Sequence, residues 1–213
     1  MNRILSMLKE SIARCPDRAA LTDMQDGRSL TYSELDTLAR RIAAKLIRCG
    51  AVGGRYVTVE LPRSLEYIAA QLGVWYAGCA YAPLSDEYPE DRLAYIRENC
   101  DAAAVINERF MRGIEMEEPV TDTAFPDESA PALLNYTSGS TGRPKGVMHG
   151  FVSISDSVLR YNKEMGLTDD SNHAITASLT FIVSVQSVWG PLSMGIKATL
   201  VPFEAMRETL AAG

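Results

Sequence analysis

Residues that bind metals are scarce in this sequence. Its 213 residues include two histidines and four cysteines, and no two cysteines form a CxxC pair. The ligand spacing of a zinc site is therefore absent, and we expect no metal site from these residues. A chain of this length also buries a normal core without disulfides, so we expect four reduced thiols. The cysteines lie far apart, at Cys15, Cys49, Cys79 and Cys100.

The sequence also lacks a run of basic residues and a long uninterrupted apolar segment. Lysine and arginine total 21 against 27 aspartates and glutamates, a net charge of −6. This balance excludes the electrostatic signature of a nucleic-acid binder or of a protein held on anionic lipid. The most apolar stretch, 181–203, is interrupted by polar residues and a proline, and residues 1–18 contain no signal-peptide core. We expect a cytoplasmic protein with neither nucleic acid nor membrane as a partner.

Helical and strand-like patterns alternate along a chain of ordinary globular composition, 46% hydrophobic and 23% charged. Apolar residues recur at helical spacing over 35–46, and Gly50 follows at the position of a C-terminal cap. By the same reasoning we expect helices at 65–76, 90–99, 152–165 and 183–194, and strands at 20–22, 29–32, 57–61, 80–84, 102–106, 132–136, 174–177 and 198–202. This order predicts βαβ units, and hence an α/β fold of mixed, largely parallel sheets covered by helices.

One segment interrupts the alternation. Residues 113–129 carry six acidic side chains and two prolines, which is typical of an exposed connector. We therefore predict three parts: a first α/β lobe over 1–112, an acidic connector over 113–131, and a second lobe over 132–213 that is truncated.

The most informative segment is a polar, glycine-rich stretch at 137–146. Gly139 and Gly142 let consecutive backbone N–H groups turn toward one anion, and Lys145 supplies a positive charge. Four hydroxyl groups add neutral donors, from Thr137, Ser138, Ser140 and Thr141. The combination is suited to binding a polyphosphate. A flexible Ser/Gly linker is the alternative, but the apolar strands on both sides argue against it.

This stretch does not have the Walker spacing. A Walker loop places a second glycine five residues after the first, Lys directly after that glycine, and Ser or Thr directly after the Lys. Here Pro144 occupies the fifth position after Gly139, and Gly146 follows Lys145. The segment after the lysine is expected to be extended chain and not the first turn of a helix.

Residues 136–146, YTSGSTGRPKG, closely resemble the phosphate-loop signature of the adenylate-forming superfamily. That superfamily contains acyl-CoA synthetases, luciferases and the adenylation domains of nonribosomal peptide synthetases. The last group is the most similar, because LTYSEL at 30–35, AGCAYAPL at 77–84, YPEDR at 88–92 and FIVSV at 181–185 resemble its other motifs in order. The resemblance covers nearly the whole chain.

The resemblance implies an ATP-dependent reaction. A carboxylate attacks the α-phosphate of ATP to give an acyl-adenylate and pyrophosphate, and a thiol of CoA or of a carrier-protein phosphopantetheine then takes the acyl group. The implied phosphate-binding residues are Thr137, Ser138, Gly139, Ser140, Thr141, Gly142 and Lys145, with Thr137 and Lys145 in catalytic roles. Mg²⁺ assists such reactions.

Members of this family are much longer than this chain. We therefore expect the sequence to be an N-terminal fragment, with the adenine-binding aromatic, the magnesium ligand and the mobile lid in a missing half. The fragment alone is expected to be inactive and to self-associate through its exposed truncated face. The alternatives are a non-catalytic nucleotide-binding remnant and a member similar to D-alanine or acyl-CoA ligases.

The substrate class is suggested by one departure from the family pattern. Adenylation domains for α-amino acids carry an aspartate after the matched Phe181, and this chain has Ile182 there. Val183 and Gln186 are further positions that the resemblance places at the acid pocket. An apolar lining favours an acid without a free α-amino group, such as an aryl, keto, hydroxy or fatty acid. The open alternatives are an alignment shifted by one residue or an acidic partner elsewhere in the protein.

Overall fold

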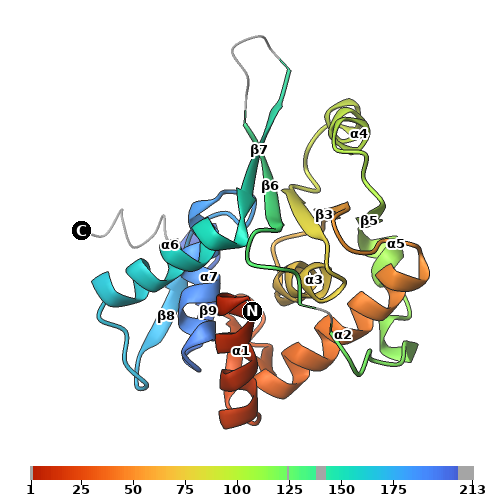
Figure 1. Ribbon diagram of the computed structural model, residues 1–213. Coiled ribbons are helices and arrows are strands. Elements are labelled where there is room, and N and C mark those ends of the chain that lie inside the picture. The colour runs from red at the N-terminus through yellow and green to blue at the C-terminus, as the bar shows by residue number, and fades with distance from the viewer. Residues whose placement is uncertain (1, 124, 138–142, 206–213) are drawn as a thin grey trace.

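Two β-sheets form the frame of the chain in the computed structural model, which describes residues 2–123, 125–137 and 143–205 (Figure 1). The five-stranded sheet has the order β5-β3-β4-β6-β7, and the four-stranded sheet has the order β2-β1-β9-β8. Their strands are β1 Ala19–Asp23, β2 Ser29–Thr31, β3 Tyr56–Glu60, β4 Ala80–Leu84, β5 Ala104–Ile106, β6 Pro131–Thr137, β7 Lys145–Gly150, β8 Asn172–Ile175 and β9 Lys197–Leu200.

Most strand pairs in both sheets are parallel. β3 pairs in parallel with β4 and β5, β4 with β6, and β9 with β1 and β8. The two antiparallel pairs, β1 with β2 and β6 with β7, are formed by strands that follow each other directly in the chain. The predicted fold class, α/β with mixed and largely parallel sheets covered by helices, is therefore confirmed.

Side chains cap the start of several helices. The helices are α1 Arg3–Arg14, α2 Tyr32–Arg48, α3 Leu65–Tyr76, α4 Glu90–Asn99, α5 Glu108–Met111, α6 Phe151–Glu164 and α7 Val183–Ser193, with a short 3₁₀ turn, η1, at Ile114–Met116. At the start of α2, Thr31 and Glu34 form a reciprocal capping box. Ser64 accepts a hydrogen bond from the Tyr67 N–H and so caps α3.

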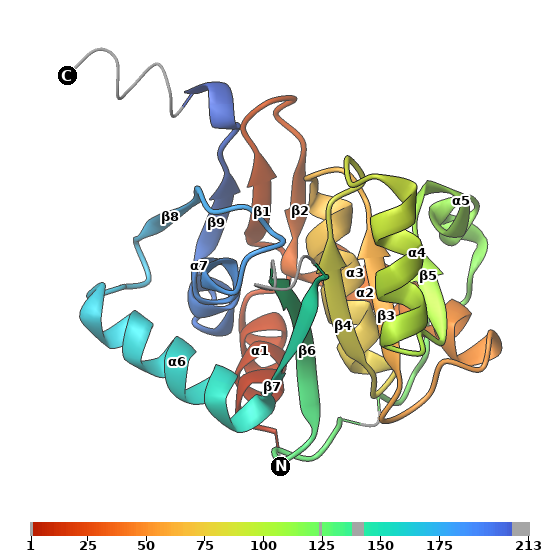
Figure 2. The same cartoon turned by 90° about the horizontal axis from the view of Figure 1, so that it is seen from above.

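The core lies between the two sheets and contains α3 and α7 (Figure 2). Trp75 of α3 and Trp189 of α7 are both 1% exposed or less, and their ring centroids lie 4.8 Å apart. The Trp75 ring also lies 5.3 Å from that of Phe151 at the start of α6. Three helices therefore meet at one aromatic cluster, which Tyr81 of β4 also joins at 5.5 Å from the Trp75 ring. Within the described part of the chain, no helix has the length and apolar character needed to span a bilayer.

Both sheets combine strands from before and after the acidic segment 113–131. That segment runs beside α2, where the Arg40 guanidinium donates to the carbonyl oxygens of Val120 and Thr121. Arg48 forms an ion pair with Glu117. The division into two lobes and the self-association of the chain stay predictions. Each sheet contains strands from both predicted lobes.

Candidate functional site

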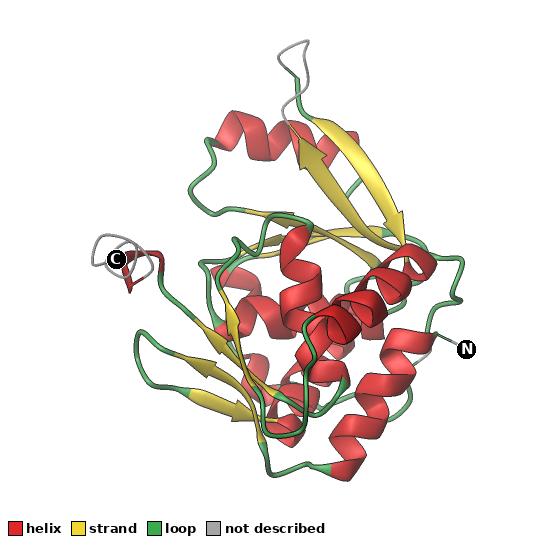
Figure 3. Cartoon of the chain, turned by 90° about the vertical axis from the view of Figure 1, so that its left-hand side faces the viewer, coloured by secondary structure: helices red, strands yellow, loops and turns green. Residues whose placement is uncertain are grey.

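The predicted phosphate-binding segment connects the two arms of the β6–β7 hairpin. Thr137, the last residue of β6, stands opposite Lys145, the first residue of β7. Both side chains are exposed, and the arms extend away from the body of the chain (Figures 1 and 3). The other expected phosphate ligands, Ser138, Gly139, Ser140, Thr141 and Gly142, lie outside the described residues. The described ends of the segment thus place one hydroxyl and one ammonium group side by side.

The hairpin is tied to the core along β6. The Trp75 indole N–H donates to the Ala132 carbonyl oxygen at 2.9 Å, and the Asn135 amide donates to the Thr180 carbonyl oxygen at 2.8 Å. Because Thr180 directly precedes Phe181, the hydrogen bond from Asn135 joins the β6–β7 hairpin to the segment expected to bind the acid. A Cβ added to Gly146 would lie 3.0 Å from Leu134 Cδ1, so a larger residue there would require the Leu134 side chain to shift by a few tenths of an ångström.

The expected substrate segment lies at the start of α7 and is open to solvent. Phe181, Ile182 and Val183 are 62%, 40% and 55% exposed. They form an apolar surface without a charged member, next to β6. Gln186, one turn later, donates from its side-chain amide to the Ser157 hydroxyl on α6.

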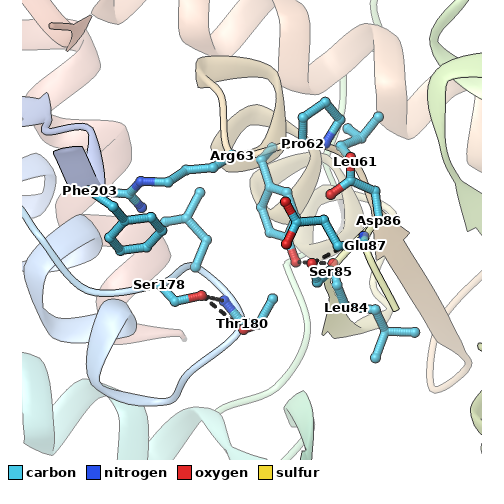
Figure 4. A pocket seen from close by; sticks show the side chains of 12 residues that line it. Leu61, Pro62, Arg63, Leu84, Ser85, Asp86, Glu87, Ser178, Thr180 and Phe203 are labelled. Atoms are coloured by element: carbon cyan, nitrogen blue, oxygen red, sulfur yellow. Dashed lines mark hydrogen bonds between the residues drawn. The ribbon is translucent and has the colours of Figure 1, made fainter. Parts of the chain in front are cut away.

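A pocket of about 220 Å³ lies between the carboxyl ends of the two sheets (Figure 4). Parallel α/β sheets characteristically bind ligands at this edge. The pocket is lined from one sheet by residues that follow β3 and β4, including Arg63, Asp86 and Glu87, and from the other by the loop after β8, including Ser178 and Thr180. It therefore adjoins the Thr180–Phe181 segment and, through Asn135, the phosphate hairpin.

Arg63 joins the two sheets at this pocket. Its guanidinium donates to the carbonyl oxygens of Ala177 at 2.9 Å, Ile175 at 2.6 Å and Val201 at 3.2 Å, and it stacks over the Phe203 ring at 5.0 Å. Burial lowers the pKa of Arg63 to about 10, because desolvation disfavours the charged form. Sequence reasoning missed this residue, although an arginine two residues after a predicted parallel strand is a signal for the carboxyl edge of a sheet.

The chain's fit to the expected cofactors differs between ATP and Mg²⁺. Thr137 and Lys145 offer a neutral donor and a positive charge at adjacent exposed positions, which fits a polyphosphate. In the portions of the chain that the structure describes, no three His, Cys, Asp or Glu side chains are grouped to hold a metal ion. The described residues thus offer no cluster that would hold Mg²⁺ by protein ligands alone.

Comparison with known proteins places the sequence in a family. The family model described as AMP-binding enzyme matches residues 8–124 and 113–212. The chain is 30% identical over 226 residues to a dimodular nonribosomal peptide synthase of Bacillus subtilis (strain 168), covering 96% of the chain and 9% of that protein. It is 35% identical to bacitracin synthase 1 of Bacillus licheniformis, over 92% of the chain and 4% of that protein. The chain thus spans a small part of the curated relatives it matches.

Solved structures share its fold. The N-terminal subdomain of Klebsiella oxytoca NpsA, in complex with 3-hydroxyanthranilyl-AMSN, superposes with a TM-score of 0.83 at 22% identity, over 99% of this chain and 57% of that one. The N-terminal domain of FACL13 from Mycobacterium tuberculosis gives a TM-score of 0.86 at 17% identity, over 95% of this chain and 57% of that one. Sequence and fold agree: the chain belongs to the AMP-binding enzyme family and spans the N-terminal part of an adenylate-forming domain.

Proposed function

We propose that the protein carrying this chain activates a carboxylic acid as an acyl-adenylate. The observation that carries the proposal is the pairing of Thr137 with Lys145 across the β6–β7 hairpin, in a chain that the AMP-binding family model matches. Bound ATP supplies an electrophilic α-phosphorus and pyrophosphate as the leaving group. The acid's carboxylate oxygen forms the new bond to phosphorus as the bond to the pyrophosphate oxygen breaks.

The chain's own residues act by binding and charge stabilisation. The Lys145 ammonium faces the negative charge that accumulates on the departing pyrophosphate, and the Thr137 hydroxyl donates a hydrogen bond to the same group. Ser138, Ser140 and Thr141 add hydroxyl donors, and Gly139 and Gly142 add backbone N–H groups. Phosphoryl-transfer catalysis of this kind needs positioning and electrostatics and no covalent nucleophile on the protein.

The second half-reaction transfers the acyl group to a thiol. The thiol sulfur attacks the acyl carbon, and AMP leaves with the electrons of the broken acyl–phosphate bond. The acceptor is a carrier-protein phosphopantetheine or CoA. Support for the carrier protein comes from relatives named nonribosomal peptide synthases and from NpsA, which has been studied as an artificial fusion of an adenylation domain with a carrier domain.

The substrate we propose is an acid without a free α-amino group. An ammonium group held against Ile182 loses hydration and gains no counter-charge from that side chain, and even about 3 kcal/mol corresponds to more than a hundredfold in affinity. Phe181 and Val183 extend the same apolar surface. NpsA, with which this chain shares its fold, has been solved with an analogue whose acyl part is aromatic.

The test is an ATP–pyrophosphate exchange assay on the protein that carries this chain. Each α-amino acid is paired with its keto, hydroxy and des-amino analogues, and aryl and fatty acids complete the panel. We expect exchange with an acid that lacks the α-amino group. If no acid in the panel supports exchange while the protein still binds ATP measurably, the protein is instead a non-catalytic nucleotide-binding protein.

The substrate class is tested by Ile182→Asp. This variant places a carboxylate at the position that the family uses for the substrate ammonium, so we expect its preference to shift toward the α-amino acid by about tenfold or more. The ratio of kcat/KM for each amino acid and its des-amino analogue measures the shift. Val152→Asp, at an exposed position on α6, is the matched control for adding a charge to an apolar surface site. A wild-type preference for the amino acid would contradict the proposed class.

A further inference from the structure

One helix, α4, contacts both arms of the phosphate hairpin. On the β6 arm, the Tyr136 hydroxyl donates a hydrogen bond to Asn99 Oδ1 at 2.7 Å. On the β7 arm, the Tyr95 hydroxyl donates to the Pro144 carbonyl oxygen at 3.4 Å, and the Arg143 guanidinium lies 5.9 Å from the centre of the Tyr95 ring. The helix therefore touches the chain on each side of the segment expected to bind phosphate.

α4 is itself firmly attached to the five-stranded sheet. Arg97 Nε donates to Glu60 Oε1 at 2.9 Å, and the Glu60 side chain, at the end of β3, is 4% exposed. A second guanidinium nitrogen of Arg97 forms an ion pair with Glu90 at 2.6 Å. Leu93 and Ile96 are buried against Leu84 of β4. Charge and apolar packing thus hold the helix in place over the sheet (Figure 2).

In the described chain the β7 arm receives few side-chain contacts from outside the hairpin, among them that of the Tyr56 hydroxyl with Met148 Sδ at 3.5 Å. β7 is the edge strand of its sheet and pairs with β6 alone among the strands that the structure describes. Lys145 is its first residue, at the open end of the hairpin. Among the hydrogen bonds of the described residues, the one from Tyr95 to Pro144 reaches the hairpin from outside at the residue next to Lys145. At 3.4 Å the hydrogen bond from the Tyr95 hydroxyl is long and therefore weak. We assign most of the stabilisation of this arm by Tyr95 to the packing of its ring near Arg143.

We propose that Tyr95 is a positioning residue that holds the Arg143–Lys145 segment, and with it the Lys145 ammonium, at the place where pyrophosphate develops charge. The proposal rests on the proposed adenylation function. Its physical basis is that electrostatic stabilisation falls when a charged group is misplaced, and a displacement of about 1 Å can cost a hundredfold in rate. Among the described residues, the hydrogen bond and the cation–π contact of Tyr95 are made with Pro144 and Arg143, away from the Phe181–Val183 surface, so we expect the binding of the acid to be independent of it.

The test compares Tyr95→Ala with Tyr95→Phe in the protein that carries this chain. Pyrophosphate exchange gives kcat and separate KM values for ATP and for the acid. Proteolysis by trypsin gives a readout that does not need activity, because cleavage after Lys145 requires local opening of β7, while the bond between Arg143 and Pro144 resists trypsin. Tyr88→Ala is the matched control, since Tyr88 packs on the same apolar cluster.

We expect Tyr95→Ala to raise the KM for ATP and lower kcat, with a combined loss of about tenfold or more. The KM for the acid should stay unchanged, and cleavage after Lys145 should become several-fold faster. Tyr95→Phe keeps the ring and should restore nearly wild-type values, and Tyr88→Ala should leave cleavage after Lys145 unchanged. Wild-type cleavage in Tyr95→Ala, or an equal rise in both KM values, would overturn the inference.

The failure of the proposed function looks different. In that case the wild-type protein shows no exchange with any acid, and the proteolysis comparison still reports whether Tyr95 holds the β7 arm. If the wild type is active and Tyr95→Ala has wild-type kinetics and cleavage, the role of Tyr95 is contradicted while the proposed adenylation function stands.

Discussion

At the scale of single residues, two cations on this chain have opposite surroundings. Lys145 is exposed, and its ammonium has no ion pair within the portion of the chain that is described. Arg63 is largely buried and donates to three backbone carbonyl oxygens. A free exposed charge can bind a ligand, whereas a guanidinium occupied by carbonyls stabilises the fold. We therefore expect removal of the Lys145 charge to impair function and removal of the Arg63 charge to impair folding.

Lys145→Ala should lower pyrophosphate exchange without unfolding the protein. A charge-assisted contact to phosphate is worth roughly 1.5–3 kcal/mol, which corresponds to roughly a ten- to hundredfold loss in kcat/KM for ATP. Lys163→Ala, at another exposed lysine near the end of α6, is the control and should keep full activity. Unchanged turnover in Lys145→Ala would remove this residue from the site.

Arg63→Ala should destabilise the fold. The substitution leaves carbonyl oxygens of Ile175, Ala177 and Val201 without their donor, and hydrogen bonds to a charged group contribute roughly 1.5–3 kcal/mol. Urea unfolding should show a loss of about that size. Arg55→Ala removes an exposed arginine whose pair with Asp101 spans 3.4 Å, and it should change stability by less than about 1 kcal/mol. Equal midpoints for the two variants would contradict the bridging role of Arg63.

At the scale of elements, helices α2 and α3 approach each other closely at a glycine. A Cβ added to Gly73 of α3 would lie 2.6 Å from Ile42 Cγ2 and 2.9 Å from the Ala39 carbonyl oxygen of α2. Both contacts are shorter than van der Waals separation, and one partner is backbone that cannot turn aside. The glycine therefore sets the distance between these helices, although alanine is the better helix former.

Gly73→Ala should accordingly lower the free energy of unfolding, in spite of its higher helix propensity. Overpacking in a core typically costs about 1–3 kcal/mol. Thermal or urea denaturation measures the loss. Gly53→Ala is the matched control, because a Cβ there would meet only the Gly78 carbonyl oxygen at 3.9 Å, and its stability should change by less than about 0.5 kcal/mol. A stabilised Gly73→Ala protein would show that the helices separate at little cost.

At the scale of the whole molecule, both histidines are placed where burial disfavours their charged forms. Desolvation lowers the pKa of His149, on β7, and of His173, on β8, below the usual value of 6.5. His173 Nε2 also lies 3.0 Å from the Tyr161 hydroxyl of α6. Each sheet therefore contains a histidine that binds a proton more readily in the unfolded chain than in the folded one.

The stability of the molecule should therefore fall as the solution becomes acidic. Below pH 6.5 the unfolded chain binds more protons at these groups, so the stabilisation is complete above that pH and is lost as the pH falls through the lowered pKa values. Urea unfolding between pH 7.5 and 5.5 measures the slope. In His173→Gln, which keeps a polar partner for Tyr161, we expect a shallower slope. Identical slopes in the two proteins would contradict the assignment to His173.

Short-range patterns in the sequence determined the elements of this protein. The predicted boundaries of β4 and α4 agree with the structure, because the apolar run of β4 and the turn residues Gly78 and Pro89 ahead of the two elements act over a few neighbours. The four-residue helix α5 was missed, since it is too short to show a period. The segment expected to bind phosphate was proposed from its composition, and the structure shows its described ends as the facing ends of two strands.

Only the tertiary structure decided how these elements combine. β9 lies between β1 and β8. The sequences of the strands do not predict this order, because the backbone hydrogen bonds that pair strands are the same for any sequence. Arg63 finds its carbonyl partners 112 to 138 residues away, and Tyr95 meets Pro144 across 49 residues. Such contacts depend on where whole elements pack, so the sequence determined the chemistry of the hairpin and the tertiary structure decided which residues hold it in place.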